Sequence, residues 1–388
     1  MKNFDAVIVG AGLAGLQCAK LLSQRGAKIL LVDRKNDLTK GVHTTGIFVR
    51  KTLEDFDFPA GTLGKAVKNV TLYSPKLKTI NLTSEKDEFR VGKMGKLYES
   101  FLRECVENGV EFENGTRYVS TETKESESRV RLEKNGKSFE IETKVVIGAD
   151  GARSRVAKDL NLDENKEWIV GCEEVYKCNS MADEPRLHCF LDAKLAPGYL
   201  AWVANDGEEI HVGVGGYAEK FNPREALKQF RDKTACKIVD LNTSNLLETR
   251  GGRIPVGGVL RRIANRHGLL VGDAAGAVSP LTAGGLDPCL RLSKLAAEIV
   301  LKRLETENSQ VLLEYSGELF RARFVSRLWM RRLIALASNQ TLLEIGFNLL
   351  HGKWGEKFAR HVFFGRGSFP DVKIKEVKIE NMQNAANL

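Results

Sequence analysis

Two kinds of hydrophobic pattern divide the chain into elements. Short apolar runs rich in β-branched residues occur at 4–9, 28–32 and 268–272. Such runs are typical of strands that are covered on both faces of a sheet. Between the first two runs, the periodic segment 13–25 predicts a helix that stops at Gly26. Strand, helix and strand in this order form a βαβ unit, which predicts a parallel sheet.

Alternation of apolar and polar positions takes over in the middle of the chain and predicts antiparallel strands. It runs through 67–83, 115–147 and 166–218, and the last interval holds four strand-like stretches. Helical periodicity recurs in four later segments. These are 96–107, 222–234, 288–304 and 311–362. Because we find no internal repeat and no low-complexity linker, we expect interleaved domains rather than domains in series.

Composition is ordinary for a soluble globular protein. The chain has 388 residues, of which 43% are hydrophobic and 28% charged, and this excludes a mostly disordered chain. The length suggests two or three domains, or one large core with insertions. The net charge of +9 favours an acidic partner such as a phosphorylated ligand or an anionic membrane. No nucleic-acid-binding signature accompanies it, so we expect no nucleic acid partner.

Cysteine usage points to the cytoplasm. The seven cysteines have no paired spacing, which favours reduced thiols. One group is close enough in sequence to raise the question of a metal. It consists of Cys172, Cys178, His188 and Cys189. No C-x-x-C pair occurs in it, so buried strand thiols are the better interpretation and we expect no metal.

The apolar run 7–19 has the length of a signal-peptide core, but it contains three regularly spaced glycines and follows Asp5. A nucleotide-binding turn fits these residues better. No run of 18 clean apolar residues exists, so we expect no transmembrane helix. The chain is expected to be cytoplasmic, with a peripheral membrane contact as a further option.

The glycine turn carries the first chemical signal. Gly10, Gly12 and Gly15 form G-x-G-x-x-G between the first strand and its helix, and Asp33 ends the next strand. Gly10 permits the tight turn, Gly12 lets backbone N–H groups approach a pyrophosphate, and Gly15 lets the helix pack on the strand. Asp33 can accept hydrogen bonds from ribose hydroxyls, and Arg34 beside it is a further contact. An acidic residue here allows FAD or NAD.

Two later motifs favour FAD. Asp150-Gly151 follows a buried strand, and Gly272-Asp273 follows another. With the glycine turn, they resemble the three FAD motifs of the para-hydroxybenzoate-hydroxylase-fold flavoproteins, in matching order over most of 1–305. The resemblance implies FAD as the cofactor. It also implies that Asp273 contacts the ribityl or pyrophosphate region and that Asp150 lies near the cofactor and helps to hold the fold.

The loop after Asp273 leads into a helix. Its backbone N–H groups could face the pyrimidine edge of a flavin and stabilise the negative charge of the reduced form. The contacts expected from this loop are Pro280, Gly284, Gly285 and Leu286. A plainer interpretation is that Asp287 caps the helix and Pro288 takes its first position; both interpretations can hold together.

One basic position stays open. The usual pattern of this fold has an arginine that contacts FAD about seven residues before a helical leucine. Arg90 has that spacing to Leu97. A second register places Met94 at the arginine position, beside Lys93. Either Arg90 or Lys93 is therefore expected to take the FAD-contacting position.

Within this fold, residues 251–286 are similar to the geranylgeranyl reductase family. They contain an I-P-x-G-G turn, the Gly-Asp strand and a P-x-T-x-G-G loop. Residues 199–215 carry a second likeness, in which Trp202 and Gly213-Val214-Gly215 match while Leu200 and Ala204-Asn205 depart from the pattern. In the family this strand pair lines a hydrocarbon tunnel. The resemblance therefore implies a substrate wall, formed by Tyr199, Trp202 and Gly213. The alternative is that Tyr199 and Trp202, as bulky strand residues, only fill the core.

The segment 40–46 departs from that family, which carries a Cys-Gly motif here. Proton donation to a half-reduced alkene needs an acid near the flavin, and His43 could serve because histidine titrates near neutral pH. The alternative is that His43 only hydrogen-bonds a loop.

We therefore predict an α/β protein: a Rossmann-like FAD-binding domain with an interleaved antiparallel β-sheet substrate domain and a helical C-terminus. The FAD-binding parts are 1–60, 90–165 and 250–305, the substrate parts 61–89 and 166–249, the helical region 306–370 and the loose tail 371–388. The helical region carries basic residues among aromatic ones. These are Arg321, Arg323, Arg327, Arg331 and Arg332. Helices packed on the core, a surface for an anionic membrane or an isoprenoid diphosphate, and a partner-helix site all fit this pattern.

The expected activity is that of an FAD-dependent oxidoreductase in which reduced flavin passes hydride to a carbon–carbon double bond of an isoprenoid or other apolar substrate. Two alternatives remain: a monooxygenase of the same fold, and a flavin electron-transfer or binding protein. Because no second nucleotide-binding βαβ unit is apparent, the electron donor is expected to be transiently bound NAD(P)H or a protein reductant.

Overall fold

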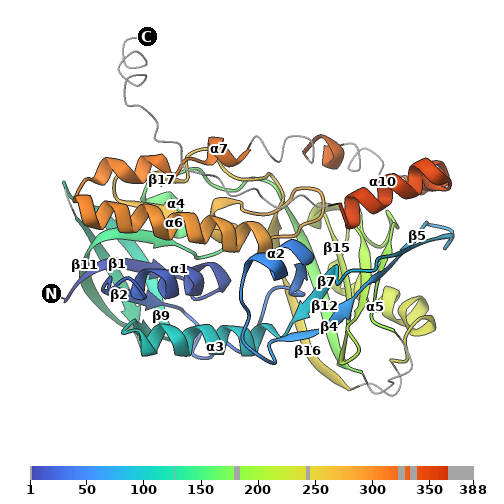
Figure 1. Ribbon diagram of the computed structural model, residues 1–388, viewed down its shortest axis with the longest axis horizontal. Coiled ribbons are helices and arrows are strands. Elements are labelled where there is room, and N and C mark those ends of the chain that lie inside the picture. The colour runs from blue at the N-terminus through green and yellow to red at the C-terminus, as the bar shows by residue number, and fades with distance from the viewer. Residues whose placement is uncertain are drawn as a thin grey trace, which may run out of the picture.

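The structure is a computed structural model. It describes residues 2–125, 127–178, 184–241, 245–321, 328–332 and 339–365. Three sheets organise it (Figure 1).

An eight-stranded sheet, in the order β17-β18-β11-β1-β2-β8 with β10 and β9 beside β11, forms one half of the molecule. Its strands are β1 (Lys2–Val9), β2 (Ile29–Val32), β8 (Glu111–Glu113), β9 (Thr116–Thr123), β10 (Ser128–Lys134), β11 (Lys137–Gly148), β17 (Ala264–Asn265) and β18 (Gly268–Leu270). β1 lies parallel to β2 and β11, and β18 is parallel to β11. The parallel sheet expected from the first βαβ unit is confirmed.

Helices α1 (Leu13–Ser23), α3 (Met94–Glu107) and α6 (Leu286–Thr306) pack together on this sheet (Figure 1). Their apolar positions enter one large hydrophobic core with the four buried residues of β2. Burial of apolar surface from both layers is the main force that holds them together. The carboxyl ends of β1, β2 and β11 consequently meet at one edge of the sheet, where the glycine turn begins.

A seven-stranded sheet in the order β16-β12-β15-β14-β13-β5-β6 forms the other half. Its strands are β5 (Asn69–Tyr73), β6 (Thr79–Thr83), β12 (Trp168–Lys177), β13 (Arg186–Phe190), β14 (Ala201–Asn205), β15 (Glu209–Gly216) and β16 (Leu246–Pro255). The alternating segments 67–83 and 166–218 thus form the strands expected of them. All pairs are antiparallel except β13 with β5, which joins these two distant segments in parallel.

A three-stranded sheet, β3-β7-β4, lies beside the larger ones. Its strands are β3 (Ile47–Val49), β4 (Leu63–Val67) and β7 (Phe89–Gly92). The remaining short helices connect the sheets. They are α2 (Arg50–Asp55), α4 (Arg155–Asp159), α5 (Pro223–Lys233), η1 (Ala218–Lys220), η2 (Ala235–Lys237) and η3 (Gly272–Ala275). Helix α5 covers one face of the seven-stranded sheet through a separate apolar cluster with β15.

The C-terminal part is helical in short pieces rather than over one long stretch. The described elements are η4 (Ser309–Glu314), α7 (Gly317–Arg321), α9 (Gln340–Leu350) and α10 (Lys353–Phe363). Arg323, Arg327 and the expected tail 371–388 lie outside the described residues. Phe347 of α9 and Ala359 of α10 pack against β5 and β13. In the part of the chain that the structure describes, no helix has the length and apolar character needed to cross a membrane.

Candidate functional site

A continuous cavity of about 1420 Å³ extends from the glycine turn after β1 to helices α9 and α10. Pockets for single drug-sized ligands measure roughly 300–1,000 Å³. This cavity therefore has room for a cofactor and a substrate together. Its walls come from the edge of the eight-stranded sheet, one face of the seven-stranded sheet, the loop 278–286 and the C-terminal helices.

Each of the three glycines in the first turn is required for a different physical reason. Gly10 has φ +103°, and a Cβ there would lie 2.3 Å from the carbonyl oxygen of Ala149. A Cβ on Gly15 would lie 1.9 Å from the carbonyl oxygen of Gly10, so α1 could not pack where it does. A Cβ on Gly12 would meet nothing within 4 Å. Gly10 and Gly15 thus serve the fold, whereas Gly12 leaves an open cradle at the start of α1.

Asp33 ties the end of β2 to this turn. Its Oδ2 accepts a hydrogen bond from the backbone N–H of Ala11 at 2.7 Å, and its Oδ1 accepts one from Lys35 N–H at 2.8 Å. Asp33 and Arg34 both line the cavity. Because a carboxylate offers about four acceptor sites, Asp33 keeps capacity for ligand hydroxyls.

Asp150 follows β11 and caps α4. Its carboxylate accepts hydrogen bonds from the Ser154 hydroxyl and from the backbone N–H groups of Arg155 and Val156. Gly151 next to it has φ +83°, a conformation that favours glycine. Both residues line the cavity. These contacts show that Asp150 helps to hold the fold, by fixing the start of α4.

Asp273 lies in η3, and its side chain faces the cavity. Among the described residues no group donates a hydrogen bond to its carboxylate, and burial alone raises its pKa to about 6. Gly272 has φ +59°, and a Cβ there would lie 2.8 Å from Cβ of Ala14. A buried carboxyl group without a protein donor is suited to accept hydrogen bonds from a hydroxylated ligand.

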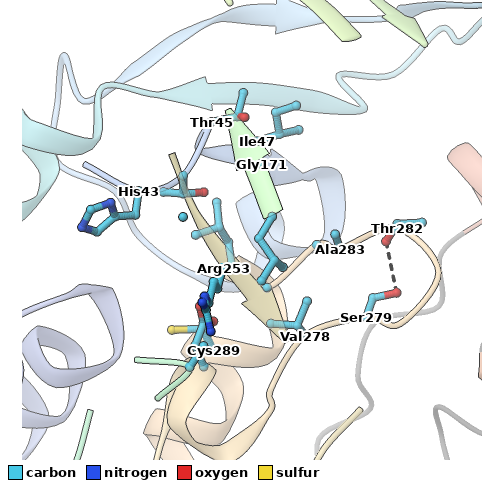
Figure 2. A pocket seen from close by; sticks show the side chains of 18 of the residues that line it. His43, Thr45, Ile47, Gly171, Arg253, Val278, Ser279, Thr282, Ala283 and Cys289 are labelled. Carbon is cyan, nitrogen blue, oxygen red and sulfur yellow. Dashed lines mark hydrogen bonds between the residues drawn. The ribbon is translucent and has the colours of Figure 1, made fainter. Parts of the chain in front are cut away.

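The loop 278–286 forms the opposite wall (Figure 2). Ser279 N–H donates to Gly284 C=O, and the carbonyl oxygens of Pro280 and Thr282 accept from Arg331 and from the Tyr199 hydroxyl, at 3.1 and 2.7 Å. These bonds hold the loop in one shape. Residues Ser279, Thr282, Gly284, Gly285 and Leu286 line the cavity.

Helix α6 begins at Leu286, with Gly285 as its N-cap and no side-chain cap. The first N–H groups of a helix have no intrahelical partner, so this end presents free donors and the positive end of the helix dipole. The interpretation of Asp287 as the cap with Pro288 in first position is wrong. Asp287 is the second residue of the helix and so lies past the cap position, and its carboxylate instead accepts from the Thr52 hydroxyl and Arg291.

His43 lies on the cavity wall, exposed, with its Nδ1 2.9 Å from the carbonyl oxygen of Gly251 (Figure 2). The loop hydrogen bond expected as the alternative is therefore present, beside a position that contacts the cavity. Neither Arg90 nor Lys93 lines this cavity. Arg90 pairs with Asp87 at 3.2 Å, and Lys93 pairs with Glu208. The sequence spacing placed both near the flavin, but strand β7 and the residue after it direct them to acidic partners.

Tyr199 and Trp202 line the cavity, with ring centroids 6.4 Å apart and rings nearly perpendicular. Trp202 pairs with Gly213 across β14 and β15, and a Cβ on Gly213 would lie 2.2 Å from the indole ring. Gly213 therefore supports the wall from below and does not line it. Both aromatic residues thus lie on the cavity, and Gly213 leaves room for the Trp202 ring; their contact with a substrate stays a prediction.

Sequence reasoning missed a charged group beside this wall. Glu173 on β12 lines the cavity and contacts His211 on β15, while Arg250 on β16 lies 3.7 Å from Glu173. The sequence offered only a weak signal for this group, namely that a glutamate and a histidine occupy inward positions of strands that are otherwise apolar. Nothing in the local pattern indicated that they meet.

The far end of the cavity was missed as well. It is lined mainly by apolar side chains from β5, β7, β13 and both C-terminal helices. These are Leu72, Phe89, Leu187, Cys189, Leu343, Phe347, Leu350 and Phe363. Local periodicity predicted these strands, but it did not indicate that they and the C-terminal helices meet at one cavity.

Comparison with known proteins agrees with this architecture. Residues 3–328 match the family described as FAD binding domain. The chain is 28% identical over 320 residues to a digeranylgeranylglycerophospholipid reductase of Methanocaldococcus jannaschii, covering 80% of this chain and 81% of the relative. It superposes with a TM-score of 0.81 on a geranylgeranyl bacteriochlorophyll reductase-like protein of Thermoplasma acidophilum, at 20% identity, covering 94% of this chain and 98% of that one.

The fold is also similar to that of aklavinone-11 hydroxylase, solved with FAD and aklavinone. The TM-score is 0.67 at 16% identity, with 83% of this chain and 67% of that chain covered. The resemblance to geranylgeranyl reductases, stated from the sequence motifs, is confirmed.

The residues present fit FAD. The open cradle at Gly12 suits a pyrophosphate, the unpartnered carboxyl of Asp273 suits ribityl hydroxyls, and the free N–H groups at the start of α6 suit a flavin that gains negative charge. These features lie on one cavity. The chain belongs to the FAD binding domain family and is an FAD-dependent oxidoreductase.

Proposed function

We propose that this enzyme reduces carbon–carbon double bonds in the isoprenoid chains of a lipid. One observation carries the proposal: the cavity that holds the cofactor residues continues without interruption into a wall of apolar side chains. A hydrocarbon chain loses contact with water when it enters such a space, and each buried methylene contributes about 0.8 kcal/mol. The printed name of the M. jannaschii relative supports an isoprenoid glycerolipid as the substrate class.

FAD, when bound and reduced, supplies the hydride for this reaction. The chain's own residues bind and orient it. We assign cofactor contacts to Gly10, Gly12, Asp33, Arg34, Asp150, Gly151, Gly272, Asp273, Gly284, Gly285 and Leu286. Pro280 does not line the cavity and holds the loop instead, through its carbonyl oxygen and Arg331. Gly15 takes part through helix packing. Tyr199 and Trp202 shape the passage between the cofactor residues and the apolar end, and the apolar end excludes water from the reacting bond.

His43 stays a prediction as proton donor. Its position on the cavity wall supports the assignment, and its hydrogen bond to Gly251 fixes one ring nitrogen while the other remains available. Replacement by glutamine keeps a polar side chain of similar size and removes the acid, which tests the assignment.

The helix pair α9–α10 is proposed to contact a lipid surface. Leu342, Ile345 and Leu349 of α9, with Trp354 and Phe358 of α10, are exposed apolar residues; Leu349 is 78% exposed and Trp354 is 86% exposed. Leu342 and Phe358 also line the cavity, so the exposed apolar surface adjoins its apolar end. Exposed Lys357 adds positive charge that favours an anionic bilayer, whereas Arg360 pairs with Glu356 at 3.1 Å.

The electron donor is proposed to bind only transiently or to be a protein. Within the described residues, one strand–helix–strand unit carries a glycine turn of the dinucleotide type. Anaerobic mixing of the oxidised holoenzyme with NADH, NADPH or a reduced ferredoxin, followed by the loss of flavin absorbance, distinguishes the donors.

The proposed reaction is tested without a natural donor. The holoenzyme is reduced anaerobically with dithionite and mixed with vesicles that contain a geranylgeranyl glycerophospholipid. We expect the oxidised flavin spectrum to return and the lipid to gain two hydrogen atoms for each bond reduced. A lipid of the same headgroup with saturated chains is the control. Failure of several such alkenes to oxidise the reduced flavin contradicts the proposal.

The same experiment in air separates the monooxygenase alternative. Incorporation of an oxygen atom into the lipid, with consumption of oxygen, would replace the reductase by a hydroxylase or epoxidase. The structural likeness to aklavinone-11 hydroxylase concerns the fold alone.

A further inference from the structure

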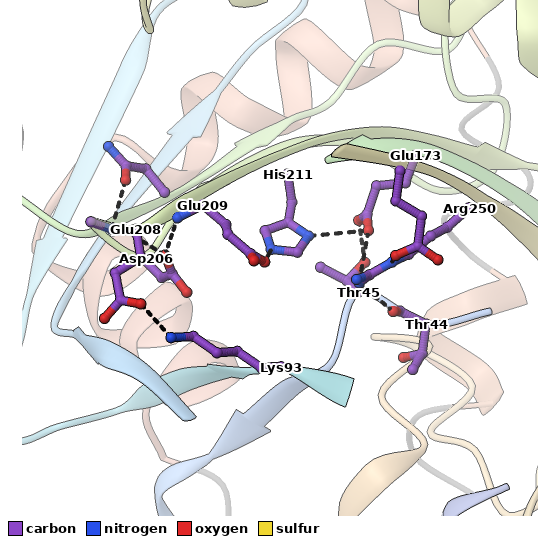
Figure 3. Close-up of polar contacts among 12 residues, drawn as sticks. Thr44, Thr45, Lys93, Glu173, Asp206, Glu208, Glu209, His211 and Arg250 are labelled. Carbon is purple, nitrogen blue, oxygen red and sulfur yellow. Dashed lines mark hydrogen bonds and ion pairs between the residues drawn. The ribbon is translucent and has the colours of Figure 1, made fainter. Parts of the chain in front are cut away.

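The seven-stranded sheet carries a line of charged residues, Glu173, His211 and Glu209 (Figure 3). Glu173 on β12 lines the cavity. His211 on β15 places Nδ1 at 3.2 Å from Oε1 of Glu173 and Nε2 at 3.5 Å from Oε2 of Glu209. The line is therefore Glu173, His211 and Glu209, in which both ring nitrogens face a carboxylate.

All three side chains lie on the face of the sheet that looks away from α5. Ile210, Val212 and Val214 of β15 enter the apolar cluster with α5, so the alternate residues of this strand point to the cavity side. Glu173 pairs in register with Gly213, two residues after His211. This alternation brings the acid of β12 and the histidine of β15 together on one face.

The middle of the line is its most deeply buried part. The side chain of Glu173 is 4% exposed, that of His211 is 0% exposed, and that of Glu209 is 25% exposed. Glu209 thus reaches solvent at one end, and Glu173 reaches the cavity at the other. His211 lies sealed between them, where the carboxylates are its contacts for proton exchange.

The cavity end is held rigidly. The Thr45 hydroxyl and the Trp202 indole N–H both donate to Oε2 of Glu173, the latter at 2.9 Å. This leaves Oε1 to His211. Arg250 lies 3.7 Å from Glu173, and it donates to the carbonyl oxygen of Thr44 and to Glu248. Trp202, which also forms the wall of the passage, therefore orients the carboxyl group of Glu173.

Other charged groups face His211 from neighbouring elements. Asp206, in the turn between β14 and β15, and Lys93, after β7, lie near it and Glu209, and Arg250 faces it from β16. Burial opposes protonation of His211, but the charge of Glu173, its hydrogen bond to the ring and the nearby carboxylate of Glu209 raise the pKa of His211 to about 9. Burial likewise opposes ionisation of Glu173, yet the charge of His211 lowers its pKa.

We propose that Glu173, His211 and Glu209 form a proton relay that supplies the reduction through the wall of the cavity. The inference rests on the proposed function, since reduction of one double bond adds one hydride and one proton. His211 gives the proton on Nδ1 to Oε1 of Glu173. Glu173 gives it to the carbon that does not take the hydride. The neutral His211 ring keeps its Nε2 proton, so the ring flips to carry that proton to the Glu173 side, and the bare nitrogen that then faces Glu209 takes up a solvent proton through that carboxylate. No oxidant or reductant beyond the flavin is required.

The relay supplies a proton to a site from which the substrate excludes water. A lipid chain that fills the apolar end displaces water, so bulk solvent cannot protonate the reacting carbon there. His43 is exposed and depends on solvent at its own edge of the cavity. The buried relay carries its proton behind the wall and works while the lipid is in place.

Single-turnover mixing of dithionite-reduced holoenzyme with the alkene lipid tests the relay. We expect E173Q to slow alkene-dependent oxidation of the flavin by about a hundredfold, the scale of general acid catalysis, and H211Q and E209Q to slow it by about tenfold or more. E174Q is the matched control. Glu174 is the next residue, and it bonds Arg231 and Tyr176 instead.

The expected pattern keeps FAD content, reduction by dithionite and oxidation by oxygen at wild-type levels in every variant. A wild-type rate in E173Q, or loss of the rate in H43Q alone, overturns the relay while the reductase activity stands. Absence of alkene oxidation in the wild type overturns the proposed function itself.

A second readout needs no cofactor. In the FAD-free protein labelled with ¹³C-histidine, one of the six histidines should remain protonated at pH 8 and should disappear in H211Q. E173Q and E209Q should each bring that resonance toward neutral titration, whereas E174Q should not. Ordinary titration of all six histidines in the wild type overturns the proposed storage of a proton at His211.

Discussion

The two ends of the cavity are built on different principles. The cofactor end is made of backbone: glycine turns after parallel strands, free N–H groups at a helix start and one unpartnered carboxyl group, Asp273. The substrate end is made of side chains from several strands and two helices, with Glu173 and His211 beside it. At the first end an added Cβ on Gly10 or Gly15 would clash with backbone atoms, whereas the second end depends on charge and apolar surface.

The largest expected effect comes from the cofactor end. Gly15→Ala places a Cβ 1.9 Å from the Gly10 carbonyl oxygen, a backbone atom that cannot move aside. We expect a loss of at least about 3 kcal/mol in the free energy of unfolding, even without FAD. Urea unfolding of the FAD-free protein measures it.

Gly12→Ala is the matched variant, because its Cβ meets nothing within 4 Å. It should leave the unfolding free energy of the FAD-free protein within about 0.5 kcal/mol and weaken FAD binding by at least about tenfold, since the methyl group enters the cradle. Equal destabilisation by both variants would contradict the distinction drawn between the two glycines.

Trp202→Ala tests the substrate end. It removes a large ring that lies over Gly213 and donates to Glu173. A loss of about 2–3 kcal/mol is expected in the unfolding free energy, with FAD content retained because no cofactor loop is touched. Thermal unfolding and the flavin-to-protein absorbance ratio measure these quantities. Loss of FAD without loss of stability would contradict the separation of the cavity into a cofactor end and a substrate end.

The pH dependence of stability sharpens the same comparison. The folded pKa of His211 is about 9, above its usual value of 6.5, so its stabilising contribution is complete below pH 6.5 and is lost as the pH rises through 9. The loss is at most about 3 kcal/mol. Glu173 has the opposite sign, because its lowered pKa contributes stability above its unfolded value that is lost in acid.

Unfolding of the wild type and H211Q between pH 6 and pH 10 isolates the histidine. The difference between the two curves should shrink as the pH rises, and E174Q should follow the wild type. If the difference in unfolding free energy does not change with pH, His211 is not charged in the folded protein, and the prediction is wrong.

The smallest effect on the fold is expected at the exposed face of α9–α10. Trp354→Ser should reduce binding to anionic vesicles by about tenfold, because burial of a large apolar side chain contributes about 1.5–3 kcal/mol. Unfolding should change by less than about 0.5 kcal/mol. Leu247→Ser, at an exposed position on β16, is the control. Equal vesicle binding by both variants would contradict the proposed lipid contact.

Much of the fold followed from pattern. The parallel strands β1 and β2, helix α1 and the alternating strands β12 to β15 lie within a few residues of their predicted positions. Each depends on local periodicity and on glycine at fixed spacing. The parallel pairing of β13 with β5 did not follow, because it joins segments more than a hundred residues apart, and periodicity says nothing about partners. The residue bounds of the expected domains stay a prediction.

By itself the sequence determined the cofactor chemistry, because a glycine turn, a strand that ends in Asp33 and a Gly-Asp motif impose their geometry on adjacent backbone. Tertiary structure decided which side chains meet. Arg90 pairs with Asp87, and Asp287 pairs with Arg291. Glu173 contacts His211, which is 38 residues away in the sequence, and Thr45, which is 128 residues away. Side-chain contacts depend on strand order and on which face each residue occupies, and neither is written in any single local segment.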